Sequence, residues 1–170
     1  GGAAPIYYNY GDNFIYDGGN VYYDGQPLGT ASQYYDQLSG LAGSGAEPEA
    51  DASDWLPLGV FSLVESGQKQ PSLVFQLAVN KAGTIRGNCS QPDQAFVGVV
   101  NGAVDKEKQL AAWTVGDDKQ TVYETGLYNL TKDEAPALVH RGPDKTEQRL
   151  LVRMKESDNP QPAGDADANQ

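Results

Sequence analysis

Histidine and cysteine supply much of the nucleophilic and metal chemistry of proteins, and this 170-residue chain has one of each, His140 and Cys89. A catalytic serine or cysteine normally needs a histidine as its base, and the sequence has no Gly-x-Ser-x-Gly motif. Zinc sites need several such ligands. Asp144 is close enough in sequence to contact His140. We nevertheless expect a structural or exposed His140, a small buried Cys89, and a protein that is not an enzyme.

Oxygen ligands of the kind that calcium prefers occur in successive Gly-rich turns near the N-terminus. They are Asp12, Asn13, Asp17, Asn20 and Asp24. Their spacing matches no standard calcium loop, and Asp and Asn also favour turns through hydrogen bonds to their own backbone. Turn formation is therefore the first interpretation. A weak calcium site at Asp12, Asp17, Asn20 and Asp24 is the alternative, and no other cofactor is predicted.

Two carboxylates can hydrolyse a glycosidic bond, and Glu124 and Glu134 lie near the ends of expected strands. The reaction requires a facing pair about 5–9.5 Å apart in a cleft. Because the chain has 23 acidic residues, pairs of this kind arise by chance. Nothing in the sequence distinguishes this one.

Tyrosine is concentrated at the N-terminus, where six of the ten tyrosines precede residue 30. They are Tyr7, Tyr8, Tyr10, Tyr16, Tyr22 and Tyr23. Neighbouring residues of a strand face opposite sides, so both members of an adjacent pair cannot enter one core. Tyrosine rings suit protein contacts and sugar stacking. Three interpretations stay open: contact with a protein or a second copy, carbohydrate binding, or a lid over the chain's own β domain.

Turn and capping signals divide the first third of the chain. Residues 1–29 alternate short β-prone runs with Asp-Gly and Gly-Asn turns, which predicts a Tyr/Gly-rich hairpin region. Thr30 and Gln33 fit a capping box at the start of one short helix, expected within residues 30–43 with Gly43 closing it. Residues 44–54 are small and acidic, and they indicate a linker.

Period-two alternation of apolar residues begins near Leu58 and continues through a β domain, residues 55–156. The expected strands are 58–65, 72–80, 83–89, 95–104, 109–115, 120–128, 136–140 and 147–154. Short polar gaps between them imply antiparallel neighbours. The sequence thus predicts a mainly β fold, an antiparallel eight-strand meander that forms a small barrel or strongly curled sheet, with a sandwich as the alternative. Residues 157–170 are expected to be a disordered tail.

The net charge of −11 is unevenly distributed. Residues 1–67 contain nine acids and no base, whereas residues 68–156 contain eleven acids and twelve bases. Phosphate binding needs clustered Lys and Arg, so no nucleic-acid partner is expected. The apolar runs are far shorter than the roughly 18–20 residues of a membrane span. No membrane span is predicted.

Several blocks of the β domain recur together in one family. They are DWLPLGVFSL at 54–63, AAWTVGDD at 111–118, ETGLYNLTKDEAPALVH at 124–140 and QRLLVRMK at 148–155. With the preceding GGNVYYDG segment, they make the chain similar to a group of secreted bacterial proteins labelled mu-protocadherin-like cell-surface proteins. The resemblance implies an extracytoplasmic location, secreted or at the cell surface, and supplies no catalytic residues. The paired acidic calcium motifs of true cadherins are not present in the sequence.

Two functional hypotheses follow from these observations. The first is a non-enzymatic surface or envelope protein whose β domain is a scaffold and whose Tyr-rich region contacts a protein or a second copy. The alternative is a barrel-type binding module for a small apolar ligand or a carbohydrate.

Overall fold

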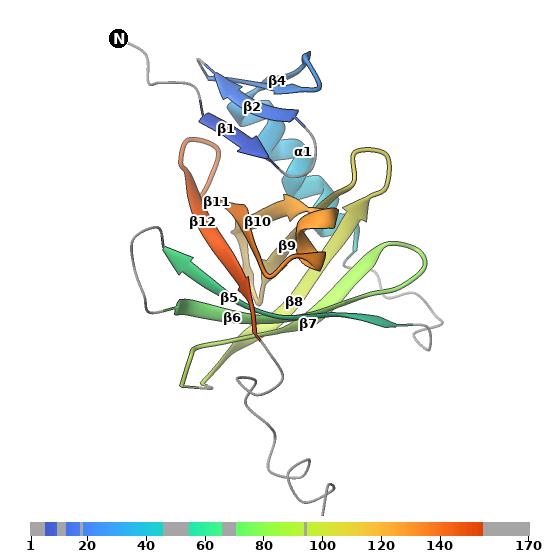
Figure 1. Ribbon diagram of the computed structural model, residues 1–170. Coiled ribbons are helices and arrows are strands. Elements are labelled where there is room, and N and C mark those ends of the chain that lie inside the picture. Colours follow the sequence, from blue (N-terminus) through green and yellow to red (C-terminus); the bar gives the residue numbers. More distant parts are fainter. Residues whose placement is uncertain are drawn as a thin grey trace, which may run out of the picture.

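A closed barrel of eight antiparallel strands forms the body of the molecule (Figure 1). The computed structural model describes residues 6–9, 13–17, 19–45, 55–65, 71–93 and 95–154. Each barrel strand pairs with the next along the chain, and the last pairs with the first. The predicted eight-strand meander is therefore confirmed, and it closes as a barrel and not as a sandwich.

The barrel strands lie within two residues of their predicted ranges at each end. They are β5 (Leu56–Glu65), β6 (Pro71–Val79), β7 (Thr84–Ser90), β8 (Phe96–Asp105), β9 (Leu110–Val115), β10 (Asp118–Gly126), β11 (Glu134–His140) and β12 (Thr146–Arg153). A 3₁₀ helix, η1 (Leu127–Thr131), connects β10 to β11. The agreement reflects the strict alternation of most strands and the turn-forming residues between them.

Large apolar side chains fill the barrel interior. Phe75 packs edge-on against Trp113 and Tyr123, with ring centroids 5.4 and 4.9 Å apart respectively. These rings belong to one buried cluster to which all eight strands contribute. Eight strands enclose an interior that side chains can just fill. This packing argues against a ligand inside the barrel.

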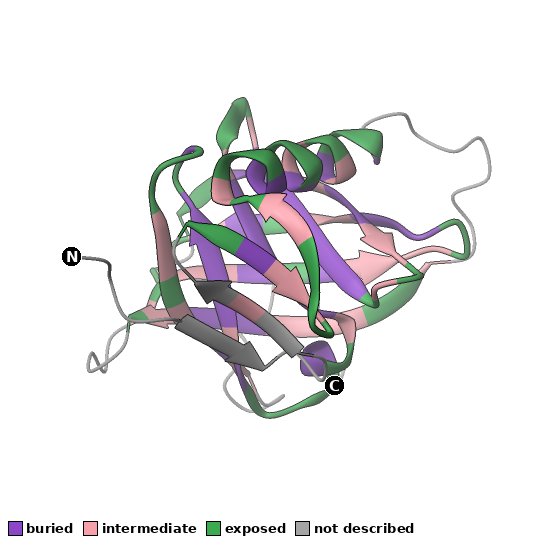
Figure 2. Cartoon of the chain, turned by 90° about the horizontal axis from the view of Figure 1, so that it is seen from above, coloured by how far each residue is buried: buried purple, intermediate pink, exposed green. Residues whose placement is uncertain are grey.

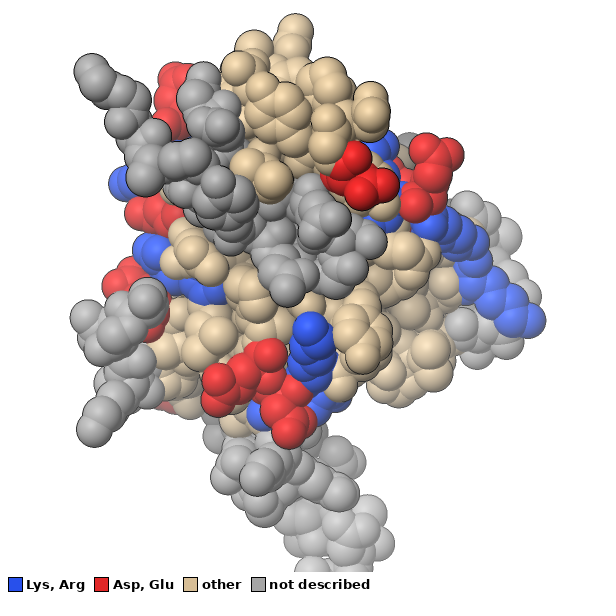
Figure 3. Space-filling view, turned by 45° about the horizontal axis from the view of Figure 1, so that its top comes forward, with Lys and Arg blue, Asp and Glu red and all other residues tan. Residues whose placement is uncertain are grey.

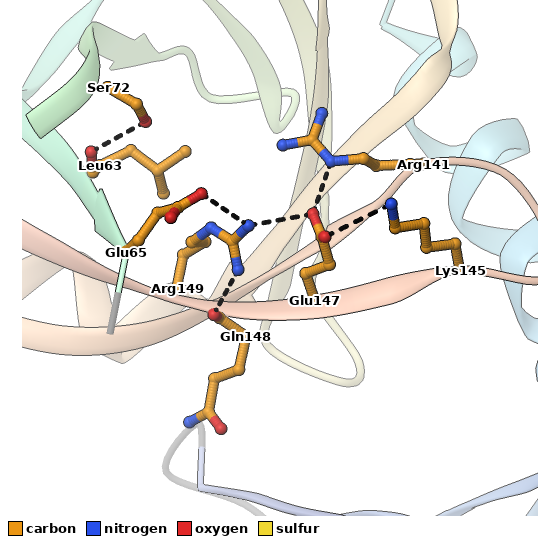
Figure 4. A network of polar contacts seen from close by, with 8 residues as sticks. All are labelled: Leu63, Glu65, Ser72, Arg141, Lys145, Glu147, Gln148 and Arg149. Atoms are coloured by element: carbon orange, nitrogen blue, oxygen red, sulfur yellow. Dashed lines mark hydrogen bonds and ion pairs between the residues drawn. The ribbon is translucent and has the colours of Figure 1, made fainter. Parts of the chain in front are cut away.

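Charged side chains form a network near the start of β12, where this strand pairs with the end of β5 (Figure 4). Arg149 lies 3.0 Å from Glu65 and 3.1 Å from Glu147 through its Nη2 atom. Arg141, which follows β11, also pairs with Glu147. The network therefore links the first strand of the barrel to the last two.

The other end of β12 contacts η1. Arg153 donates hydrogen bonds to the carbonyl oxygens of Leu58 and Leu130. Its guanidinium lies 4.9 Å from the centre of the Phe61 ring, a distance at which a cation is attracted to an aromatic face. Arg153 thus covers this end of the interior core.

Four short antiparallel strands precede the barrel and form a separate sheet in chain order. They are β1 (Ile6–Asn9), β2 (Asn13–Asp17), β3 (Asn20–Tyr23) and β4 (Gln26–Thr30). The predicted hairpin is the β2–β3 pair. Helix α1 (Ala31–Ser44) follows directly, and its predicted capping box is present: Gln33 N donates to Thr30 Oγ1 at 3.1 Å, and Thr30 N donates to Gln33 Oε1 at 2.9 Å.

Helix α1 and strand β3 cover the outer face of one half of the barrel (Figure 2). Their contact is a second buried cluster, made of Val21, Tyr34, Tyr35, Leu38, Ala42, Leu110, Ala112, Val122 and Leu138. Strand β9 is buried along its whole length, because its inward residues enter the interior core and its outward residues meet α1.

The end of α1 differs from the prediction. The helix does not close at Gly43 but continues to Ser44, and the Gly45 amide binds the carbonyls of Ala42 and Gly43. A Cβ atom on Gly45 would lie 1.9 Å from the Gly102 carbonyl oxygen, so glycine at this position lets the helix end directly against β8. The remainder of the predicted linker, 46–54, and the predicted tail, 157–170, lie outside the described residues.

Within the described part of the chain, no helix has the length and apolar character needed to cross a membrane.

Candidate functional site

An open groove crosses the outer face of β5, β6 and β7, on the half of the barrel that α1 does not contact. Its volume is about 570 Å³, within the range of roughly 300–1,000 Å³ that is typical of small-molecule sites. The lining residues are Trp55, Pro57, Gly59, Val60, Gln76, Leu77, Ala78, Arg86, Gly87 and Asn88. We call this the β5–β7 groove.

Strand register brings the groove residues together in two rows across the sheet. Val60 pairs with Gln76, which pairs with Asn88, and in the next row Ala78 pairs with Arg86. Residues paired across antiparallel strands lie about 4.5–5.5 Å apart. The polar side chains of β6 and β7 are therefore close neighbours on one face of the sheet.

A close approach between β6 and β7 shapes the floor of the groove. A Cβ atom on Gly87 would lie 1.7 Å from the carbonyl oxygen of Gln76. Only glycine fits there without a backbone shift. The glycine lies between Arg86 and Asn88, which are two residues apart on β7 and therefore have their side chains on the same face of the sheet.

The polar side chains of the groove have few partners in the protein. Arg86 Nη1 donates one hydrogen bond, to the Ile85 carbonyl at 3.0 Å, and no described carboxylate pairs with it. Desolvation by burial lowers the pKa of Arg86 below its ordinary value, but arginine keeps its charge in proteins. Among the described residues, no hydrogen-bond partner is found for the side chains of Trp55, Gln76 or Asn88.

Exposed apolar residues continue the site onto β8, the next strand. Phe96, Val97 and Val99 have exposed fractions of 66, 46 and 47%, and Val99 pairs with Asn88 at the groove edge. Exposed apolar groups in a contiguous patch indicate a binding surface. The candidate surface therefore extends from Trp55, before β5, to Phe96 on β8, across three strand spacings of about 14 Å in total.

The sole histidine belongs to a buried polar cluster between the barrel and α1. His140 Nε2 lies 2.6 Å from Glu124 Oε1, and its Nδ1 lies 3.0 Å from Thr146 Oγ1. Tyr34 donates its hydroxyl hydrogen to Glu124 Oε2. Glu124 and His140 are at most 1% exposed. This arrangement is the structural role expected of His140, and no hydrogen bond joins the histidine to Asp144.

The positions of two further predicted groups, the Glu124–Glu134 pair and Cys89, can be compared with the sequence analysis. Glu134 is exposed on β11, four residues from Leu138, the partner of Glu124, which is about 13 Å along the strand. The two carboxylates therefore do not face each other in a cleft. Cys89 is fully buried in the interior core, and desolvation raises its pKa to about 11, so the prediction of a small buried residue is confirmed.

The tyrosines of the N-terminal region lie on the strands that precede the barrel, as far as the structure describes them. Tyr22 and Tyr23 are half-buried in β3, and Tyr23 packs against the cluster beneath α1. Tyr7, Tyr8 and Tyr16 belong to β1 and β2, and Tyr10 lies outside the described residues, as does Asp12. A contact role for these residues stays a prediction.

Of the predicted calcium ligands, the structure describes the backbone of Asp17 and the residues Asn20 and Asp24, whereas Asp12 lies outside the described residues. Asp17 and Asn20 pair across the β2–β3 hairpin, but Asp24 lies beyond the opposite end of β3, about 13 Å away along the strand. Calcium ligands must all lie about 2.3–2.6 Å from one ion. Among the described residues there is also no group of three His, Cys, Asp or Glu side chains that could hold a metal ion.

Sequence reasoning did not single out Trp55, Gln76, Arg86 or Asn88. Alternation places Gln76 on the side of its strand opposite the core residues, and that is the available signal. The neighbours of such a residue depend on strand register, which no local motif in the chain specifies.

Comparison of the chain with protein-family models, curated proteins and solved structures finds no match.

Proposed function

We propose that this protein is a non-enzymatic carbohydrate-binding protein, and that its barrel presents the β5–β7 groove to a glycan. The observation that carries the proposal is the combination of Trp55 with three planar polar side chains, Gln76, Arg86 and Asn88, in one open groove. An aromatic ring offers an apolar face to the C–H surface of a sugar. Amide groups can both donate hydrogen bonds to its hydroxyls and accept them, and a guanidinium can donate them.

The polar lining favours a sugar over a purely apolar ligand. An apolar molecule would cover Gln76, Arg86 and Asn88 without replacing their bonds to water, and each unpaired buried polar group costs about 1–3 kcal/mol. The interior of the barrel is occupied by Phe75, Trp113 and Tyr123. An external site for a hydroxylated ligand agrees best with both features.

The same lining disfavours self-association through this face. Arg86 is the single charged residue among those that line the groove. Two copies that met face to face would bury two arginines with no carboxylate from either groove, and an unpaired buried charge is costly. The extracytoplasmic location implied by the family resemblance is consistent with an external glycan ligand.

The proposal is tested by isothermal titration of the whole chain with neutral hexasaccharides of glucose and of N-acetylglucosamine, and with a hexamer of galacturonic acid. We expect at least one to bind. Trp55→Ala should weaken that binding about tenfold or more, because a buried tryptophan is a frequent source of binding energy. Tyr128→Ala is the matched control, since Tyr128 is 62% exposed on η1, outside the groove. Equal loss in both variants, or no binding to any of the three, would overturn the proposal.

A further inference from the structure

Arg86 differs from the other described arginines in having almost no partners. Arg141 and Arg149 pair with carboxylates, and Arg153 donates to two carbonyls and lies over the Phe61 ring. Arg86 donates a single bond, to a backbone carbonyl. A guanidinium has five N–H donors, so most of those on Arg86 face the groove without an acceptor from the protein.

The neighbours of Arg86 in the groove indicate which ligand group would best pair with its guanidinium. Its row also contains Ala78 and Pro57, which are apolar, and its neighbours in the next row are the neutral Gln76 and Asn88. Among the described residues that line the groove, Arg86 is thus the one charged side chain, and none is acidic. A carboxylate matches the guanidinium fork through two parallel hydrogen bonds and neutralises its charge.

The acidic residues of the chain are unevenly distributed relative to Arg86. Residues 68–156, which include Arg86, are nearly neutral, whereas the excess acid lies in residues 1–67 and 157–170 and includes Asp54 immediately before Trp55. Charges farther apart than about 8 Å are largely screened at physiological salt. On the face shown in Figure 3, acidic and basic side chains lie close to one another and neither forms a continuous patch.

On the basis of the proposed carbohydrate-binding function, we infer that the groove selects acidic sugars, and that Arg86 binds the carboxylate of a uronic acid unit. Trp55 and the amide side chains of Gln76 and Asn88 then contact the ring and hydroxyls of the same or the adjoining unit. Arg86 is a specificity-determining residue in this arrangement. The other three provide affinity that acidic and neutral sugars share.

The inference is tested by titrating the whole chain, in 150 mM salt, with the galacturonic acid hexamer and with its methyl ester, which has the same ring and no charge. Wild type should bind the acid at least about tenfold more tightly, as expected for a charge-assisted bidentate contact. Arg86→Gln should bind both forms equally, and Arg86→Lys should keep only part of the preference because lysine lacks the fork. Lys132→Gln removes the same charge from η1's C-cap and should leave the preference unchanged.

Each alternative outcome has a separate meaning. Equal binding of acid and ester by wild type, or binding of the neutral hexasaccharides alone, would overturn the selection of acidic sugars and leave the proposed function standing. A preference that survives in Arg86→Gln, or disappears equally in Lys132→Gln, would also overturn it. Absence of binding to every saccharide would remove both proposals. Unchanged circular dichroism and unfolding midpoint show that the variants are folded.

Discussion

The two halves of the barrel wall share one interior core but differ on their outer faces, since one is covered and the other is open. Helix α1 lies against the outside of β8, β9 and β10, and the outward residues Leu110, Ala112, Val122 and Leu138 of β9, β10 and β11 belong to the cluster beneath α1 and β3. Strands β5, β6 and β7 have no such cover in the described structure, and Val60, Gln76, Arg86 and Asn88 line an open groove there. One continuous sheet thus has a half that packs against the N-terminal region and a half whose outer face is open in the described structure.

Side chains of this barrel are therefore buried in two separate ways, inside the barrel and beneath α1 on its outer face. The interior core, with residues from all eight strands, stabilises both halves. The second cluster beneath α1 stabilises one half, and it includes a buried polar group, Glu124, held by His140 and Tyr34. Substitutions on the outer face should therefore have large effects on the covered half and small effects on the open half.

The largest effect is expected for Glu124→Ala, on the covered half. It leaves the His140 ring and the Tyr34 hydroxyl without their acceptor in a site that is at most 1% exposed. A buried hydrogen-bonding group that loses its partner costs about 1–3 kcal/mol, and Glu124 is hydrogen-bonded to two such groups, so the free energy of unfolding in urea should fall by about 2–5 kcal/mol.

The matched control for Glu124→Ala is Gln76→Ala, which removes an outward polar side chain from the open half. Exposed substitutions without partners usually change stability by less than about 0.5 kcal/mol. Similar losses in the two variants would show that the outer faces of the two halves do not differ in the way described above.

The strands were predictable because their evidence is local. Leu73, Phe75, Leu77 and Val79 alternate with more polar residues on β6, so the sequence alone indicates which side enters the core. In contrast, residues Leu110–Val115 show no clear alternation, since both faces of β9 are buried. The outward residues of β9 are apolar because α1 packs on them, and α1 lies about seventy residues earlier in the sequence.

The candidate site was not predictable because its geometry is nonlocal. The apolar face of α1 was evident from Tyr34, Tyr35 and Leu38, but nothing in that pattern specifies which strands the helix covers. The uncovered half, and hence the groove, follows only from that choice. The groove also needs the register that places Gln76 beside Asn88, and register is determined by the fit of the whole barrel.

The next prediction concerns the interior core on the open half of the barrel. It tests whether solvent is excluded from the interior there, with the Cys89 thiol as the probe. Cys89 lies on β7 and faces the interior core, and burial raises its pKa from 9.0 to about 11. A raised pKa stabilises the fold fully below pH 9, and this stabilisation is lost as the pH rises toward 11, because the unfolded state releases the thiol proton first. We expect a loss of about 2–3 kcal/mol by pH 11.

Urea unfolding at pH 8 and pH 11 measures this loss. Cys89→Ala is the control, because it lacks the thiol but keeps Tyr123, whose raised pKa of about 12 affects the same range. The variant should therefore lose less stability with pH than wild type does. Rapid labelling of Cys89 by a thiol reagent in the folded protein would contradict a sealed interior on the open side.

The smallest effect concerns the network that joins the two halves. Glu147 pairs with Arg141 after β11 and with Arg149, which reaches Glu65 on β5 (Figure 4). The hydrogen bond from Arg141 is the largest cause of the lowered pKa of Glu147. A lowered carboxylate pKa stabilises the fold above the ordinary value of 4.5, and the contribution disappears as the pH falls through the folded value.

Glu147→Gln should therefore reduce the free energy of unfolding at pH 7 by about 0.5–1 kcal/mol, a modest amount because the side chain is 23% exposed and solvent screens its charges. The difference from wild type should shrink in 1 M salt and at pH values below 4.5, where wild-type Glu147 becomes protonated. Lys145→Gln removes a longer contact to the same carboxylate, 3.7 Å, and should have a smaller effect. If Glu147→Gln lowered the free energy of unfolding as much as Glu124→Ala does, the main polar contribution to the stability of the barrel would come from the charged network around Glu147. It would not come from the polar contacts of Glu124 beneath α1.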